Sequence, residues 1–207
     1  MVEESNDFIC EASIASRLKQ LRIGRRSRQL LANMRISKGT TNRCGGMCIK
    51  PNGDIILADS GRNRVFSTNL SGGIEVLLGS GEYGFGISND PRCCLLGRPR
   101  GVALQGESLF IADTDNKVIR VFDGHLKEKL LFGHPGEIGS LDGDAQHCRF
   151  THPTDMTKSP DGLLVADGQR LRLIKGNVVS TLFETDGQIM AVTVARNEIV
   201  FSETYAV

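Results

Sequence analysis

The chain has 207 residues, with 25 Lys and Arg against 24 Asp and Glu, 24 Gly and no Trp. Its balanced charge singles out no class of partner, and no apolar stretch approaches the roughly 20 residues of a transmembrane helix, so we expect no membrane association. High glycine and low aromatic content are typical of a soluble protein with many short strands and argue against a helical bundle.

The first 41 residues form a basic segment. From Ala12 to Gly53 there is no acid, whereas ten Lys or Arg occur. A cationic stretch of this kind binds phosphate with an affinity that falls as the salt concentration rises. However, no aromatic residue lies between Phe8 and Phe66 to stack on bases, and a charge run is often only a solvated face. If the segment binds a partner or RNA, the expected contacts are Arg22, Arg25, Arg26 and Arg28.

Residues 42–207 contain an internal repeat. The stretch "NRCGGMCIKPNGDIILADSGRNRVF" (42–66) aligns with "GRPRGVALQGESLFIADTDNKVIRVF" (97–122) and with "THPTDMTKSPDGLLVADGQRLRLI" (151–174). A fourth copy at 190–207 is incomplete. A faint copy lies at 7–21, so one interpretation of the basic segment is that it contains a degenerate first blade. The acids that end the second apolar run of the three clear copies lie 54 residues apart, near the roughly 40–50 residues of propeller repeats.

Each copy predicts short antiparallel strands. "GVAL" and "LFIA" are apolar runs separated by turn residues, which is the pattern of a hairpin. "KVIRVF" and "RLRLI" alternate with the period of two of a half-buried strand, and "IEVLLG", "EKLLFG" and "VVSTLF" predict a further strand. Units of three to four antiparallel strands, repeated radially, make a β-propeller, so we predict an all-β fold.

The copies resemble NHL repeats. The pattern of that family is Pro-x-Gly-(Val/Ile)-Ala, then a strand that ends in Ala-Asp, then Asn-basic-apolar, which 63–65 and 116–118 match. The resemblance covers about 42–207 and implies an NHL-type β-propeller with about four blades in this chain, the last incomplete, as part of a six-bladed ring. The third copy departs from the pattern, because no Asn follows Asp167. Closure of the ring would need further sequence or another chain, since open blades leave strand edges unpaired.

The repeated acids are Asp59, Asp113 and Asp167, each of which follows an apolar run and precedes a turn. A carboxylate in such a place accepts backbone N–H bonds across the turn. Because the copies belong to different blades, the three acids are expected to ring the propeller and not to converge, as a metal site would require. We therefore predict that they are structural turn acids.

The richest set of potential metal ligands lies in "DGDAQHCRFTH" (142–152). Its spacing fits neither a zinc ribbon nor an EF-hand, and the repeat explains it as a loop between blades. "CGGMC" (44–48) is not the C-x-x-C of redox or zinc sites, and the chain has no nucleophile elbow. We predict no metal, no cofactor and no catalytic residue.

These features favour a non-catalytic propeller that acts as a protein-interaction scaffold, because radial repetition builds a rigid disc whose loops form a display surface. Two alternatives stay open: RNA binding through the Arg-rich N-terminal segment, and a metal-assisted hydrolase or lyase, since propellers related to the NHL family include such enzymes. The acidic start, "MVEESNDFIC", lacks the order of a secretion signal, and six cysteines without one are interpreted as free thiols. We expect a cytoplasmic protein with a protein partner.

Overall fold

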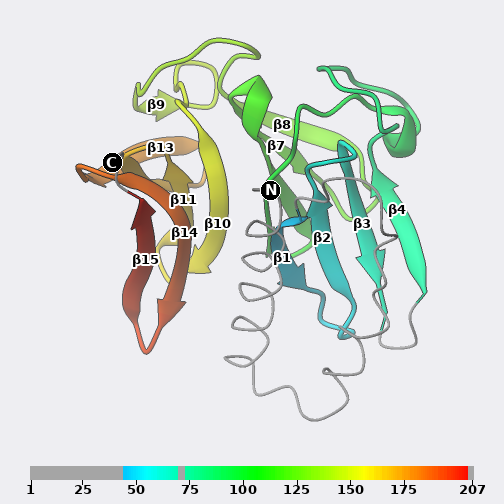
Figure 1. Ribbon diagram of the computed structural model, residues 1–207, viewed down its shortest axis with the longest axis horizontal. Helices are drawn as coiled ribbons and strands as arrows, with labels where there is room; N and C mark the ends of the chain where they lie inside the picture. The colour runs from blue at the N-terminus through cyan, green and yellow to red at the C-terminus, as the bar shows by residue number, and fades with distance from the viewer. Residues whose placement is uncertain (1–43, 70–72, 205–207) are drawn as a thin grey trace, which may run out of the picture.

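The computed structural model describes residues 44–69 and 73–204 (Figure 1). These residues form four antiparallel sheets and contain no α-helix. They also include no helix with the length and hydropathy that a membrane crossing would require. The basic segment 1–41, with the faint copy of the repeat at 7–21, lies outside the described residues.

Three of the sheets are complete blades and the fourth is a hairpin. The strand orders are β1-β2-β3-β4, β5-β6-β7-β8, β10-β11-β12-β13-β9 and β14-β15. The strands of the first two blades are β1 (Cys44–Ile49), β2 (Ile55–Asp59), β3 (Arg64–Thr68), β4 (Ile74–Leu78), β5 (Gly101–Gln105), β6 (Ser108–Asp113), β7 (Val118–Phe122) and β8 (Glu128–Phe132). Those that follow are β9 (Gly143–Asp144), β10 (Pro153–Ser159), β11 (Gly162–Asp167), β12 (Arg170–Lys175), β13 (Val178–Glu184), β14 (Gln188–Ala195) and β15 (Glu198–Thr204).

The second strand of each complete blade is the best buried. Every residue of β2 and β11 is buried, and so is every residue of β6 after Ser108. Apolar side chains of consecutive sheets fill the space between them, with Phe110 and Leu163 in the cluster between the second and third blades. A strand that is covered on both faces needs a continuous apolar run, which explains "IILA", "LFIA" and "LLVA" in the sequence.

The first strands of the blades lie next to one another around the axis of the arc. At one end they approach closely, because a Cβ added to Gly46 would lie 3.1 Å from the carbonyl oxygen of Arg100 and 3.2 Å from Asp155 Oδ1. The other carboxylate oxygen of Asp155 accepts a hydrogen bond from the backbone N–H of Val192, at 2.9 Å. The small residue on β1 therefore allows a close approach to the start of β5 and to Asp155, and the Asp155 carboxylate links β10 to β14.

Two features differ from a simple four-stranded blade. Gly143 and Asp144 were expected within a loop, but they pair with β13 as the outermost strand of the third blade. A two-residue strand is too short to produce a periodic pattern in a sequence. In the fourth sheet, β15 pairs only with β14 among the described strands and exposes Ile199, Val200 and Phe201.

Candidate functional site

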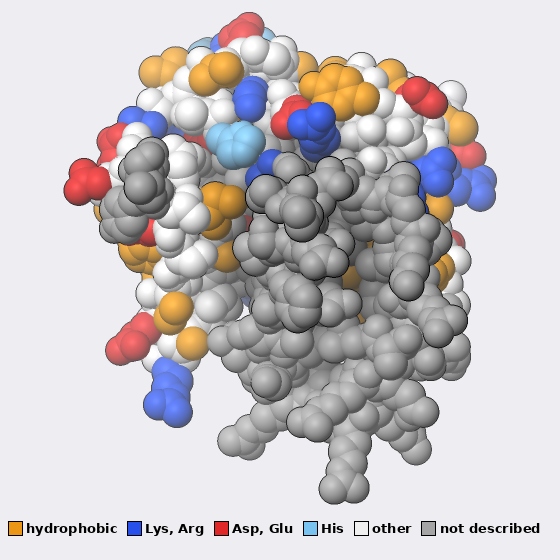
Figure 2. Space-filling view, in the orientation of Figure 1, with side chains coloured by type: hydrophobic (Ala, Val, Ile, Leu, Met, Phe, Trp, Pro, Cys, Tyr) orange, Lys and Arg blue, Asp and Glu red, His pale blue; other side chains and the backbone are white. Residues whose placement is uncertain are grey.

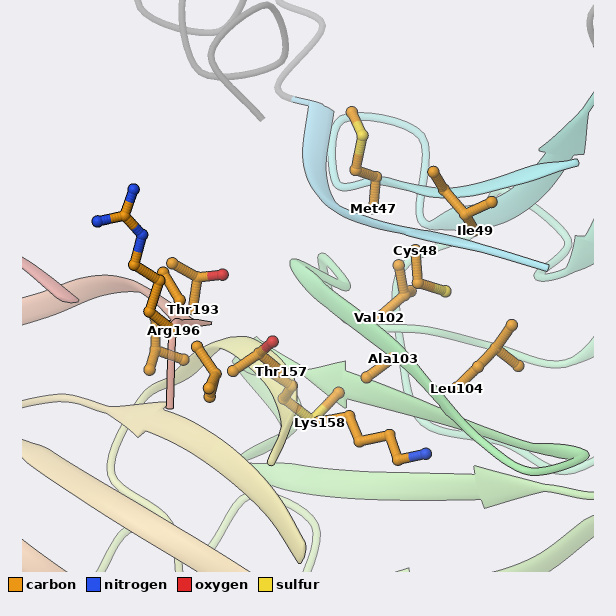
Figure 3. A pocket seen from close by; sticks show the side chains of 14 residues that line it. Met47, Cys48, Ile49, Val102, Ala103, Leu104, Thr157, Lys158, Thr193 and Arg196 are labelled. Carbon is orange, nitrogen blue, oxygen red and sulfur yellow. The ribbon is translucent and has the colours of Figure 1, made fainter. Parts of the chain in front are cut away.

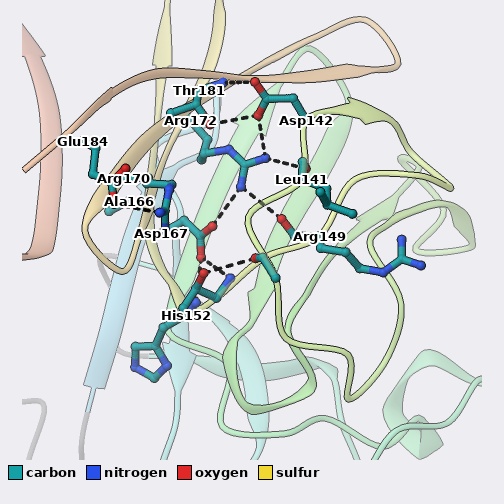
Figure 4. Close-up of polar contacts among 12 residues, drawn as sticks. Leu141, Asp142, Arg149, His152, Ala166, Asp167, Arg170, Arg172, Thr181 and Glu184 are labelled. Carbon is teal, nitrogen blue, oxygen red and sulfur yellow. Dashed lines mark hydrogen bonds and ion pairs between the residues drawn. The ribbon is translucent and has the colours of Figure 1, made fainter.

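Two of the repeated acids are fully buried and bind the segment that leads into the first strand of their own blade. Asp167 Oδ1 accepts hydrogen bonds from the backbone N–H groups of Thr151 and His152, at 2.8 and 2.6 Å (Figure 4). Asp113 Oδ1 accepts one from the backbone N–H of Gly97, at 2.6 Å. Each carboxylate therefore connects the end of the second strand to residues about 16 positions earlier in the chain.

A fully buried arginine accompanies Asp167. Arg172 lies on β12, and its Nη1 donates to Asp167 Oδ2 and to the carbonyl oxygen of Arg149, both at 3.0 Å. Its Nη2 donates to the carbonyl oxygen of Leu141 at 2.8 Å and to Asp142 Oδ1 at 3.0 Å (Figure 4). Since three of these four partners belong to the loop 133–152, the guanidinium attaches that loop to the third blade.

The second blade contains the same device. Arg120, on β7, is also fully buried, and its Nη1 lies 3.5 Å from Asp113 Oδ2. It donates to the carbonyl oxygens of Leu95 and Gly86, at 2.8 and 3.1 Å, and makes a bidentate pair with Glu128. These two carbonyls belong to the loop 79–98, which precedes the second blade. We call the pairs Arg120–Asp113 and Arg172–Asp167 the arginine clasps.

The first blade lacks such a clasp. Phe66 stands opposite Leu57 there, in the register at which Arg120 stands opposite Ile111 in the second blade. Asp59 accepts hydrogen bonds from the backbone N–H and the guanidinium of Arg62, at 3.1 and 3.2 Å, within its own turn. The three acids therefore share a place in the repeat but not a set of partners.

The loops 79–98 and 133–152 have the same backbone pairing. Tyr83 forms an isolated β-bridge with Leu96, and Ile138 forms the equivalent bridge with Phe150. The N–H of Leu95 donates to the carbonyl oxygen of Gly86 at 3.2 Å. The equivalent bond, from Arg149 to Leu141, measures 3.0 Å. The carbonyl groups of Gly86 and Leu141 thus accept both from a buried arginine and from an N–H group of their own loop. The other two carbonyl groups that the arginines bind belong to Leu95 and Arg149, the residues that donate these N–H groups.

Both loops expose large apolar side chains. Tyr83 and Ile138, at equivalent positions, are 59% and 69% exposed. Ile87 and Leu141 are 72% and 60% exposed. Figure 1 places the two loops at one end of the blades, and Figure 2 shows hydrophobic side chains spread along that rim. We call the surface formed by Tyr83, Ile87, Ile138 and Leu141 the loop face.

Cationic side chains lie near the entries to β5 and β10. Arg98 Nε is 3.6 Å from Asp115 Oδ2. Partial burial, together with the charges of Lys117 and Arg100, lowers the pKa of His152, while Asp115 opposes the shift. His152 is therefore neutral near pH 7, and the charged side chains that influence it are those of Lys117, Arg100 and Asp115.

Burial raises the pKa of Asp113 from 3.8 to about 6, although hydrogen bonds from Asn116 and Gly97 and the charge of Arg120 favour the ionised form. The folded protein thus holds this proton more tightly than the unfolded chain does. The resulting contribution to stability is complete below the unfolded pKa of 3.8 and is lost as the pH rises through about 6.

We expect the Asp113 carboxyl carbon to titrate with a midpoint near pH 6 in NMR spectra of the folded protein. The free energy of unfolding should also fall more steeply between about pH 4 and pH 6 in the native protein than in Asp113→Asn. Asp113→Asn removes the titrating carboxyl group and keeps most of the shape of the side chain. A midpoint below pH 4 would contradict the conclusion that burial is the dominant influence on the pKa of Asp113.

The remaining candidates from the sequence are the arginines of the basic segment and the potential metal ligands. Arg22, Arg25, Arg26 and Arg28 lie outside the described residues. Within 44–69 and 73–204, no group of three or more His, Cys, Asp or Glu side chains is arranged to hold a metal ion. Asp142 instead accepts from Arg172 and Thr181, and Asp144 accepts from the backbone of its own turn.

The two buried arginines and the exposed residues of the loop face were not predicted from the sequence. Arg120 and Arg172 stand in strands predicted from alternation, and alternation alone does not distinguish a buried arginine from an exposed one. A usable signal exists, since each arginine stands in the third strand of a copy that follows a long loop between blades. Arginine is almost never fully buried without partners, and here the partners are the loop carbonyls.

The comparisons with solved structures define the class of fold. The chain is similar to a structural genomics protein of unknown function from Bacteroides thetaiotaomicron, with a TM-score of 0.57 and 15% identity over 73% of this chain and 42% of that one. It is similar to an auxiliary nutrient binding protein from the same organism, with a TM-score of 0.55 and 14% identity over 74% and 43%. A catalytically inactive virginiamycin B lyase from Staphylococcus aureus with quinupristin has a TM-score of 0.55 and 18% identity over 81% and 51%.

These similar structures are β-propellers, so the predicted fold class is confirmed: the chain is an all-β protein with the blades of a propeller. The chain spans about half the length of these structures or less. No family model matches the chain, and no curated protein is significantly similar to it in sequence. At identities of 14–18% the similarity establishes the fold alone.

Proposed function

We propose that this chain is a non-catalytic propeller of the NHL type whose loop face docks a protein partner. The observation that carries the proposal is the pair Tyr83 and Ile138, which expose more than half of their surface from equivalent positions of two clasped loops. Exposed apolar side chains that gather on one surface mark interaction sites, and Tyr is among the residues that dominate binding energy at protein interfaces.

The clasps explain why these loops suit binding. A mobile loop loses conformational freedom when it binds, which subtracts from the affinity. Here each loop is already ordered by bonds from a buried guanidinium to two of its own carbonyl groups.

RNA binding is the second candidate. It depends on the ten Lys and Arg between Ala12 and Gly53, nine of which precede the described residues, so it stays a prediction from the sequence. A metal-assisted hydrolase or lyase gains no support from the arrangement of side chains within 44–69 and 73–204.

A photo-crosslinking amino acid tests the main proposal. We would place it at Tyr83 and, as the matched control, at Ile74, which is 69% exposed at the opposite end of the first blade. Crosslinks in cells should join one protein specifically to the Tyr83 position, and that protein, once purified, should bind at least tenfold more weakly to Tyr83→Ser/Ile138→Ser. Equal crosslinking from both positions, or unchanged affinity of the double variant, would contradict the proposal.

A further inference from the structure

The fourth sheet ends in an open edge. β15 pairs with β14 on one side, and no other described strand pairs with it. The opposite edge of this hairpin, along β14, borders a cavity of about 790 Å³ that β1, β5 and β10 also line (Figure 3). In each complete blade the second strand pairs with a third strand on the side where β15 has none. The edge of β15 is therefore the place of a missing third strand.

β15 lacks the features that protect the outer edges of the other sheets. The last strand of the first blade carries Glu75, that of the second blade carries Glu128, and β9 covers the edge of β13. Residues 199–202 of β15 are uncharged and contain no proline, and the first three of them are large, apolar and exposed. Proteins protect exposed edges with charge, proline or a covering segment, so an edge without these features is a template for strand pairing.

The third blade provides a surface beside this edge. Phe201 stands opposite the buried Val192, on the face of the hairpin that packs against the third blade. The ring of Phe201 contacts that of Phe183 on β13, with 5.3 Å between the centroids, and Ile199 lies on the same face of β15. The third blade has five strands and the hairpin has two, so the surface of the blade continues beyond β15. A strand added beside β15 would extend the interface that these two sheets already form.

A second copy of this chain does not fit the edge through its own β15. Every strand pair within the four sheets is antiparallel. Two antiparallel copies of one strand are related by a twofold axis perpendicular to the sheet, which keeps the same face of both hairpins on one side. Both third blades would then lie on that side, each extending past its own β15 over the other hairpin, and they would overlap. The edge therefore suits a strand that brings no blade on this face.

We propose that the edge of β15 binds an extended segment of a partner protein as an added third strand, antiparallel to β15. The backbone N–H and C=O groups along the edge supply the hydrogen bonds, as in other cases of strand addition. Because side chains alternate between the two faces of a strand, every second side chain of the segment lies on the third blade, and these side chains are apolar. The edge belongs to the fourth sheet and not to the loops 79–98 and 133–152, so this proposal does not rest on the loop face.

The probe for this edge is a short fluorescent peptide in which valine and threonine alternate between terminal lysines. Fluorescence anisotropy with the full chain should show saturable binding. N-methylation of alternate residues removes the amide donors from one edge of the peptide and keeps every side chain. Since the bound peptide pairs through only one of its edges, one of the two methylated isomers should bind as tightly as the parent and the other about tenfold more weakly.

Amide hydrogen exchange locates the bound peptide. Its addition should slow exchange about tenfold at alternate residues of 198–204, those whose N–H groups point to the open edge. Ile199→Ala/Phe201→Ala should weaken binding of the peptide about tenfold, because it removes two apolar side chains beside the added strand. Ile74→Ala is the matched control, since it removes an exposed apolar side chain from the outer strand of the first blade, and it should leave the affinity unchanged.

Three results would overturn the proposal. The two methylated isomers could bind equally well, the peptide could leave exchange in β15 unchanged, or alternate amides of β15 could exchange slowly without any peptide. The last result would show that the chain itself or a second copy occupies the edge. The comparison of methylated isomers uses the native protein, so it stands even if the double alanine variant is unstable. Tyr83→Ser/Ile138→Ser should bind the peptide like the native protein, which separates this edge from the loop face.

Discussion

Arg172→Ala is expected to lower the free energy of unfolding by about 4 kcal/mol, because removal of one partner from a buried ion pair leaves an uncompensated charge. The charge left behind is that of Asp167, which is fully buried. The carbonyl groups of Leu141 and Arg149 lose a donor at the same time. The expected loss is a large fraction of the stability of an ordinary domain.

Arg170→Ala is the matched control for that variant. Arg170 lies on the same strand and pairs with Glu184, but its side chain is 24% exposed and its partner is 51% exposed. An ion pair in contact with water contributes little, so the expected loss is below about 1 kcal/mol. Urea unfolding of both variants at pH 7 measures the difference. Similar losses for the two variants would show that the buried clasp is not a special element of the fold.

The second large effect is expected for Gly79→Ala, at the start of the loop 79–98. Gly79 has a φ of +96°, a conformation that alanine adopts only with strain, and its added Cβ would clash with the carbonyl oxygen of Asn63. Both effects act together, so we expect a loss of about 3 kcal/mol or more in the free energy of unfolding.

Gly136→Ala separates the two contributions. Gly136 also has a positive φ, +78°, but a Cβ there would meet nothing within 4 Å. Only the backbone strain remains, which costs about 1–2 kcal/mol. Thermal or urea unfolding should therefore rank Gly79→Ala well below Gly136→Ala in stability. An equal loss in both variants would mean that the chain relieves the contact with Asn63 by a small shift.

The blades were predictable from the sequence because their strands repeat. The runs that became β2, β6 and β11 are continuous and apolar, and each ends at an acid in the same place of the repeat. Burial on both faces imposes such a run, and the regular spacing of Asp59, Asp113 and Asp167 makes it visible. The short strand β9 carried no comparable pattern, since its position depends on the edge of β13.

The candidate site was less predictable, because it depends on contacts between distant parts of the chain. The guanidinium of Arg172 meets carbonyl groups 23 and 31 residues earlier, and no local pattern specifies such a distance. Tyr83 and Ile138 became recognisable as equivalent only through their bridges to Leu96 and Phe150. Propensity and periodicity describe single strands, whereas this surface arises from the way a loop folds back on its own blade.

Amide hydrogen exchange tests most directly the central claim that the arginine clasps hold the two loops as a rigid platform. The N–H groups of Leu95 and Arg149, which donate to loop carbonyls, should exchange as slowly as those of β6 and β11. Arg120→Leu should accelerate exchange at Leu95 by about a hundredfold or more and leave Arg149 unaffected, because each arginine holds only its own loop. Fast exchange at Leu95 and Arg149 in the native protein, or acceleration of both loops by one substitution, would contradict this account.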